Sequence, residues 1–313
     1  MHQPPETSLA PLLGIALKVT SIVLLVAMMV SLKFATERVT IGQVIFIRAI
    51  IGVATIYLFY RLIDRDGGRS ERLKIHSIRS HLPWALSSAA AMTMWFVALT
   101  LIPLPEATAI GFILPLLMVV LAWALLGEKI KLIRSLAITC GFAGVSIIIW
   151  PRLGTGADYG SAPAIGAALS LAAVTCWAFA QIFLRSLSKT ESGASAVITF
   201  SVATMIIALF TIPLSAIQPE LSWITPDTTG WLLLIACGIT GGLGQLCTAE
   251  SLRYATPGTL APFEYLAFPI ASVAGIVFFG EHPDANIWKG LPFVVAGGLV
   301  VILREYQLNN RSS

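Results

Sequence analysis

One acidic residue, Glu264, stands inside a long apolar stretch that covers residues 255–279. Its neighbours are the aromatic residues Phe263 and Tyr265. If the stretch is a helix, Glu264 lies about 14 Å from its start, close to the centre of a bilayer. A carboxylate at that depth is costly unless it faces a cavity or a partner group. Glu264 is therefore a candidate substrate contact or proton-exchanging group, and a structural hydrogen bond between helices is the alternative.

Four further polar residues, Lys18, Arg48, Gln181 and Gln245, also fall within apolar stretches. Lys18 either extends its long stem to the membrane surface or places a cation in a cavity. For Arg48 we favour a structural ion pair over a contact with an anionic substrate, and the sequence does not name its partner. The two glutamines either orient a ligand or join helices, because polar bonds between membrane helices are common.

Aromatic residues occur at comparable depths in several apolar stretches. Trp95, Trp177 and Phe112, together with Phe263 and Tyr265, would give a cavity aromatic walls if they face inward. Such walls suit a planar ligand that stacks against them. The alternative is packing between helices, which is the more frequent role of aromatic residues in apolar helices.

The composition places these residues in a membrane protein. Of the 313 residues, 57% are hydrophobic and 12% are charged, whereas soluble domains carry roughly 25% charged residues. Apolar runs of about 17–25 residues predict ten transmembrane helices and an all-α membrane protein. The predicted spans are 12–33, 40–60, 82–101, 105–126, 132–150, 162–185, 196–217, 229–250, 255–279 and 286–304.

The distribution of Lys and Arg predicts the orientation of these spans. With the N-terminus inside the cell, fourteen of the 20 basic residues fall on the inner side, four on the outer side and two within spans. Basic residues are retained on the cytoplasmic side, so we expect both termini, residues 1–11 and 306–313, in the cytoplasm. The expected location is the inner membrane of a bacterial cell, with the lipid bilayer as surrounding partner. No base-reading basic surface is evident, so nucleic-acid binding is not expected.

The chain repeats one pattern over residues 98–151 and 250–305, with a proline inside an apolar run and a Gly-Glu pair at its end. Five spans in each half oblige the second half to enter the membrane upside down, and inverted repeats of this kind build a site between them. We therefore expect five-helix repeats at 12–151 and 162–305 around a central cavity. The matching residues are Ala109, Pro115, Gly127 and Glu128 in the first copy, and Pro262, Pro269, Gly280 and Glu281 in the second.

Within this pattern, Pro115 and Pro269 interrupt helical hydrogen bonding, so each either hinges a moving helix or adds fixed curvature. Pro115 precedes its Gly by twelve residues and Pro269 precedes its Gly by eleven, so the two prolines need not be equivalent. For the pairs Gly127-Glu128 and Gly280-Glu281 we favour a structural or gating role at a helix end over a contact with substrate.

These motifs resemble the drug/metabolite transporter superfamily, and specifically its EamA-type members with ten helices. Arg48 also resembles a position where the family often has arginine. The resemblance covers residues 14–150 and 165–304. It implies a basket of helices whose central cavity is lined by the first, third, fourth, sixth, eighth and ninth helices. It also implies movement of small organic metabolites without ATP hydrolysis.

Secondary transport of a small organic metabolite by alternating access is the function that we expect. The first candidate substrate is a riboflavin-like planar metabolite, and amino acids or other metabolites, including exported ones, are alternatives. The direction of transport and coupling to protons stay open. The oligomeric state is also open, since Gly238 and Gly242 permit close helix contact either within the chain or in a homodimer.

Two other classes of protein are alternatives. A membrane-embedded transferase would need clustered acids, His or Cys at the end of a span, or an Asp-rich metal site, and the sequence has no such cluster. We therefore expect no enzymatic activity, cofactor or metal. A sensor or assembly subunit would not require inverted halves and would usually carry a soluble domain.

Overall fold

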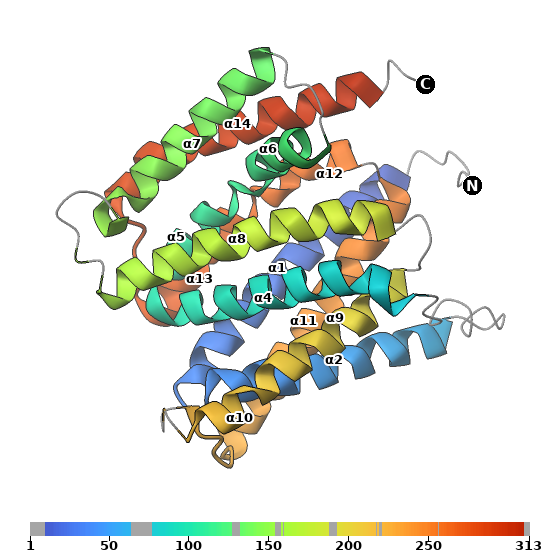
Figure 1. Ribbon diagram of the computed structural model, residues 1–313, viewed down its shortest axis with the longest axis vertical. Helices are drawn as coiled ribbons and strands as arrows, with labels where there is room; N and C mark the ends of the chain where they lie inside the picture. The colour runs from blue at the N-terminus through green and yellow to red at the C-terminus, as the bar shows by residue number, and fades with distance from the viewer. Residues whose placement is uncertain are drawn as a thin grey trace. The chain divides into compact units, whose positions relative to one another are not determined.

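The structure is a computed structural model, and its elements are all α-helices (Figure 1). It describes residues 10–63, 77–126, 132–153, 158, 160–187, 193–216, 218, 221–255 and 257–309. The helices are α1 (Ala10–Thr36), α2 (Ile41–Ile63), α4 (Ile78–Leu101), α5 (Leu104–Gly111), α6 (Leu114–Leu126), α7 (Leu132–Leu153), α8 (Ala162–Leu187), α9 (Gly193–Leu209), α10 (Thr211–Leu214), α11 (Thr228–Tyr254), α12 (Pro257–Glu264), α13 (Ala267–Phe279) and α14 (Ala285–Asn309).

The helices follow the apolar runs of the sequence. Among the described residues, seven helical stretches are long and apolar enough to cross a membrane, judged by length and composition. Three further apolar helices, Ile41–Thr55, Ile198–Pro213 and Ala285–Val301, are shorter. The expectation of an all-helical, multi-pass membrane protein is confirmed, and the full topology of ten crossings stays a prediction.

Three of the predicted spans are each broken into two helices, and a proline follows each break. The breaks after α5, α9 and α12 lie shortly before Pro115, Pro213 and Pro269. Proline has no N–H, and its ring clashes with the carbonyl four residues earlier, so a regular turn cannot form there. Tighter bonds to the third preceding residue bridge two of the breaks, from Ile113 to Ile110 and from Leu266 to Phe263. These breaks explain why α5 and α12 are short helices within long apolar stretches.

The chain forms two compact units that interleave in sequence. The first unit comprises Met1–Val26, Pro103–Thr155 and Leu243–Ser313. The second comprises Ala27–Ile102 and Gly156–Gly242. Each unit therefore combines helices from both halves of the sequence, so the units differ from the predicted repeats, which stay a prediction.

In the first unit, helices from the two halves pack in antiparallel pairs. α7 and α14 lie side by side (Figure 1), with Gly144 against Gly290 and Ala137 against Gly297. Residue numbers thus fall along α7 as they rise along α14, so the two helices run in opposite directions. Contacts between α5 and α13 follow the same antiparallel order. Glycine at the crossing of α7 and α14 lets the two backbones touch.

In the second unit, α4 and α8 also run antiparallel, since Leu101 packs against Gly166 and Trp95 against Trp177. α11 packs on α2 through its two spaced glycines. A Cβ atom at Gly238 would lie 2.6 Å from Ile51 Cβ, and one at Gly242 would lie 3.2 Å from Thr55 Cβ. This glycine motif therefore serves contact within the chain, and its face is not free for a homodimer.

The crossing of α7 and α14 yields a prediction for stability. A Cβ atom at Gly144 would lie 2.6 Å from the Gly290 carbonyl oxygen and 2.8 Å from Phe293 Cβ. Gly144→Ala should therefore lower the free energy of unfolding by about 1–3 kcal/mol through overpacking. Thermal unfolding of the purified protein in detergent measures this change.

Gly52→Ala is the matched control, because a Cβ atom at Gly52 in α2 meets nothing within 4 Å. Its effect should stay within about 0.5 kcal/mol of wild type. Equal unfolding midpoints for Gly144→Ala and wild type would show that the crossing is looser than described.

Candidate functional site

The two helix breaks of the first unit bring aromatic side chains together. Phe112 follows α5 and Tyr265 follows α12, and their ring centroids lie 4.9 Å apart at an interplanar angle of 64°. This edge-to-face arrangement is favourable for aromatic rings. The breaks meet because the two broken stretches run antiparallel and are interrupted near their middle.

The unequal spacing of the two prolines has a local explanation. Pro115 is the second residue of α6, whereas Pro269 is the third residue of α13. Both helices have 13 residues and end one residue before the glycine of the Gly-Glu pair. Counted along the sequence from these helices, the two glycines are equivalent and the prolines are offset by one.

An ion pair joins Lys18 on α1 to Glu264, the last residue of α12. The Lys18 side chain is 8% exposed, whereas that of Glu264 is 55% exposed. One turn from Lys18, Thr248 Oγ1 on α11 donates to Ser21 Oγ at 3.0 Å, and Ser21 Oγ donates to the Lys18 carbonyl oxygen at 2.9 Å. Lys18 is thus the buried member of the pair, and its carboxylate partner is the accessible member.

Tyr265 carries a buried polar group beside this pair. Its side chain lies directly against Gly298 of α14. Within the described part of the chain, the buried Tyr265 hydroxyl has no hydrogen-bond partner. A buried hydroxyl without a partner costs about 1–3 kcal/mol. A ligand that forms a hydrogen bond with the Tyr265 hydroxyl would explain why this group is buried without a partner.

The remaining candidates from the sequence divide between the two units. In the first unit Phe263 is half-buried and Gln245 is exposed. In the second unit Gln181 is exposed, and the rings of Trp95 and Trp177 lie 5.2 Å apart. Trp95 is 4% exposed, and its indole N–H finds no acceptor among the described residues. The structure therefore gathers four candidates in the first unit, namely Lys18, Glu264, Phe112 and Tyr265, and two in the second, Trp95 and Trp177.

Arg48 has different neighbours from those that the sequence favoured. In the second unit its Nε lies 3.2 Å from Met28 Sδ, its Nη1 lies 2.9 Å from Met92 Sδ, and its guanidinium lies 5.2 Å from the centroid of the Phe96 ring. No carboxylate pairs with it among the described residues. Thioethers are weak acceptors, and an aromatic face attracts a cation only modestly. The expected ion pair is therefore replaced, in the described part of the chain, by sulfur and ring contacts.

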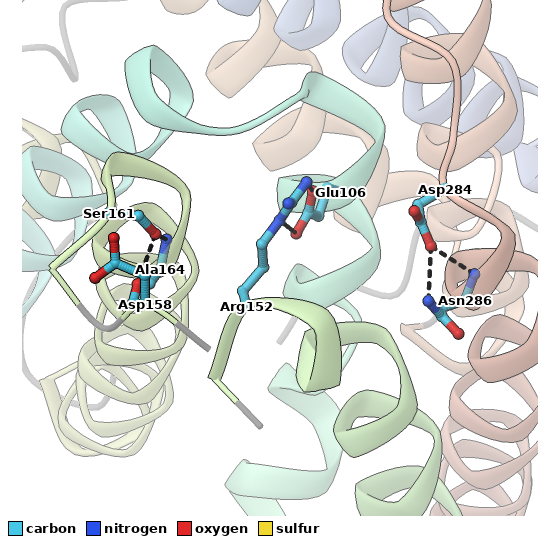
Figure 2. A network of polar contacts seen from close by, with 7 residues as sticks. All are labelled: Glu106, Arg152, Asp158, Ser161, Ala164, Asp284 and Asn286. Carbon is cyan, nitrogen blue, oxygen red and sulfur yellow. Dashed lines mark hydrogen bonds and ion pairs between the residues drawn. The ribbon is translucent and has the colours of Figure 1, made fainter. Parts of the chain in front are cut away.

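A second ion pair, which the sequence analysis did not predict, has a buried carboxylate and lies in the first unit (Figure 2). Glu106 in the first turn of α5 is 2% exposed, and its carboxylate lies 3.3 Å and 3.4 Å from Nε and Nη2 of Arg152 in the last turn of α7. Glu106 directly follows Pro105 at the start of a predicted span. The sequence signal that could have pointed to Glu106 is an acidic residue in the first turn of a predicted helix, where the helix dipole stabilises negative charge.

The same close-up contains the start of α14. Asp284 Oδ1 accepts hydrogen bonds from the Asn286 backbone N–H at 2.8 Å and from Asn286 Nδ2 at 2.9 Å (Figure 2). Asp284 thus satisfies an N–H group that the first turn of the helix leaves without an intrahelical partner.

The second Gly-Glu pair ends one helix and contacts another. Gly280 adopts a left-handed conformation with φ of 66° at the end of α13, which favours glycine. The Glu281 carboxylate accepts a hydrogen bond from the Leu104 backbone N–H at 2.8 Å, at the start of α5. The first pair, Gly127-Glu128, lies outside the described residues. A role of either pair in gating stays a prediction.

Comparisons with known proteins agree on one family. A family model described as the EamA-like transporter family matches residues 12–150 and 164–303. A riboflavin transporter of Brucella anthropi is 28% identical, over 81% of this chain and 86% of the relative. An S-adenosylmethionine uptake transporter of Rickettsia prowazekii is 26% identical, over 87% and 86%. A riboflavin transporter of Vibrio cholerae is 26% identical, over 86% and 84%.

A solved crystal structure has a similar fold. It aligns with a TM-score of 0.62 at 20% sequence identity and covers 97% of this chain and 99% of the other.

Proposed function

We propose that this chain, which belongs to the EamA-like transporter family, works by alternating access between two inverted five-helix halves. Its family and its relatives identify it as a membrane transporter of a small organic metabolite. Two antiparallel contacts in the first unit support the inversion, those of α5 with α13 and of α7 with α14. α7 and α14 are the fifth helices of the two predicted halves, and α5 and α13 are parts of the broken fourth helices of the two halves. Equivalent helices that run in opposite directions are what an inverted repeat requires.

For the orientation in the membrane, we propose that both termini are cytoplasmic and that the membrane is the inner membrane of a bacterial cell. The support is the excess of Lys and Arg in the loops that this orientation places inside. The relatives named above are bacterial. The turn after Gly127 then faces the cytoplasm, and the turn after Gly280 faces the outside.

Cysteine labelling tests this topology. In a variant without the four native cysteines, a single cysteine at Lys129 or at His282 is treated with a membrane-impermeant maleimide on intact cells. We expect labelling at His282 in intact cells and labelling at Lys129 only after the membrane is opened. Labelling of both positions from the same side would contradict the inverted arrangement.

For the substrate site, we propose the part of the first unit that contains Lys18, Glu264, Phe112 and Tyr265. The observation that carries the proposal is an ion pair with one buried member, next to an aromatic contact, at the broken middle of two apolar stretches. Aromatic edges and faces suit a planar ring, and the Tyr265 hydroxyl and the ion pair offer hydrogen bonds. A riboflavin-like planar metabolite is the first candidate, in line with two of the relatives.

A second candidate substrate is an amino acid or an S-adenosylmethionine-like metabolite. The ion pair favours it, because a zwitterionic group can exchange partners with Lys18 and Glu264. For either substrate, Glu264 is the group that would exchange a proton if transport is coupled to protons, and the direction of transport follows from the gradient that drives it.

Substitution of Glu264 tests the site. The purified protein in liposomes is assayed by counterflow of labelled riboflavin and labelled S-adenosylmethionine, which detects a carrier of either direction. Glu264→Gln should lower the rate at least tenfold, since a net loss of about 1.4 kcal/mol in binding or in the transport barrier has that effect. Membrane expression of the variant should equal that of wild type.

Asp284→Asn serves as the control, because it removes one negative charge outside the site and leaves a residue that also caps helices. It should retain the wild-type rate. A wild-type rate in Glu264→Gln would remove Glu264 from the site.

A further inference from the structure

The ion pair at the proposed site has one covered member and one accessible member. Lys18 is 8% exposed, and Glu264 is 55% exposed. A ligand that reaches the pair therefore meets the carboxylate of Glu264 before the ammonium of Lys18. From this arrangement we infer that Glu264 acts as a charge filter, which admits metabolites without net negative charge and rejects anions such as phosphate esters. The inference rests on the proposed function and deepens it by naming the substrate class.

The electrostatic reason lies in the balance of the pair. Lys18 and Glu264 together carry no net charge, so an uncharged or zwitterionic ligand leaves the site neutral. An anion can reach Lys18 only by displacing the carboxylate, and the site then holds excess negative charge in apolar surroundings. Like charges a few ångströms apart repel strongly where water is scarce. The accessible carboxylate also repels an anion on approach.

The same reasoning gives Lys18 a latent role. A buried cation without its counterion needs a new anionic partner, because an unpaired charge in apolar surroundings is very unfavourable. Removal of the Glu264 charge should therefore turn the site from one that rejects anions into one that binds them. Lys18 would be the residue that binds, and Glu264 the residue that sets specificity.

The substrate class follows from this filter. A planar metabolite with hydroxyl or zwitterionic substituents fits the site, and the phosphate ester of the same metabolite does not. A vitamin-like compound and its phosphate ester share the same ring system. A transporter with this filter distinguishes them by charge.

Titration of inorganic phosphate into purified full-length protein tests the inference by calorimetry, without any substrate. Wild type should bind phosphate weakly or below detection, and the affinity of Glu264→Gln should be at least tenfold above the wild-type value or its upper limit. The double variant Lys18→Met with Glu264→Gln should lose that binding again. Asp284→Asn, which removes a carboxylate elsewhere in the first unit, should behave as wild type.

Two outcomes would overturn the inference: phosphate binding by wild type as tight as that by Glu264→Gln, or no gain in Glu264→Gln protein that is folded. Thermal unfolding and the elution volume show whether the variant is folded, and Glu264→Ala replaces it if it is not. The titration uses no metabolite, so it tests the charge filter separately from the proposed substrates. If the counterflow assay fails with both metabolites, the proposed substrates are rejected, and the phosphate titration still decides whether Glu264 excludes anions.

A second measurement compares riboflavin with riboflavin 5′-phosphate by flavin fluorescence. Wild type should prefer the uncharged flavin, and Glu264→Gln should shift the ratio of affinities at least tenfold towards the phosphate ester. A wild-type preference for the ester would overturn the filter.

Discussion

A charged side chain in an apolar helix must be compensated by another group of the protein, because the hydrocarbon interior offers neither water nor counterions. In the first unit, Lys18 and Glu264 compensate each other, and so do Glu106 and Arg152. The first of these pairs has an accessible carboxylate, and this difference in exposure is the basis of the proposed role in recognition. The second pair holds the start of α5 to the end of α7.

Proline determines where the proposed site forms. The regular helix is interrupted before Pro115 and before Pro269, and the residues at these interruptions, Phe112 and Tyr265, contact each other. Glu264 precedes Tyr265, so the same interruption places its carboxylate within reach of Lys18. Backbone chemistry, aromatic packing and charge compensation thus converge on one region of the first unit.

Much of the fold and some of the site could be predicted from the sequence. Apolar runs predicted the helices, because length and composition are local properties. Glu264 and Lys18 could also be identified as candidate site residues from local context, since charged residues are rare in apolar runs. The ion pair between them could not be predicted, because the periodicity of a sequence does not say which helices pack together. For the same reason the sequence could not identify the sulfur contacts of Arg48, and it did not predict Glu106, whose carboxylate is buried by contacts distant in sequence.

Reversal of the charges at positions 18 and 264 tests the central ion pair most directly. Lys18→Glu alone places two carboxylates together, and Glu264→Lys alone places two ammonium groups together, so each should lower the midpoint of thermal unfolding. The double variant restores opposite charges at the two positions. If the pair holds these helices together, the double variant should unfold close to wild type. If the decreases in the unfolding midpoint caused by the two single substitutions add up in the double variant, the account is contradicted.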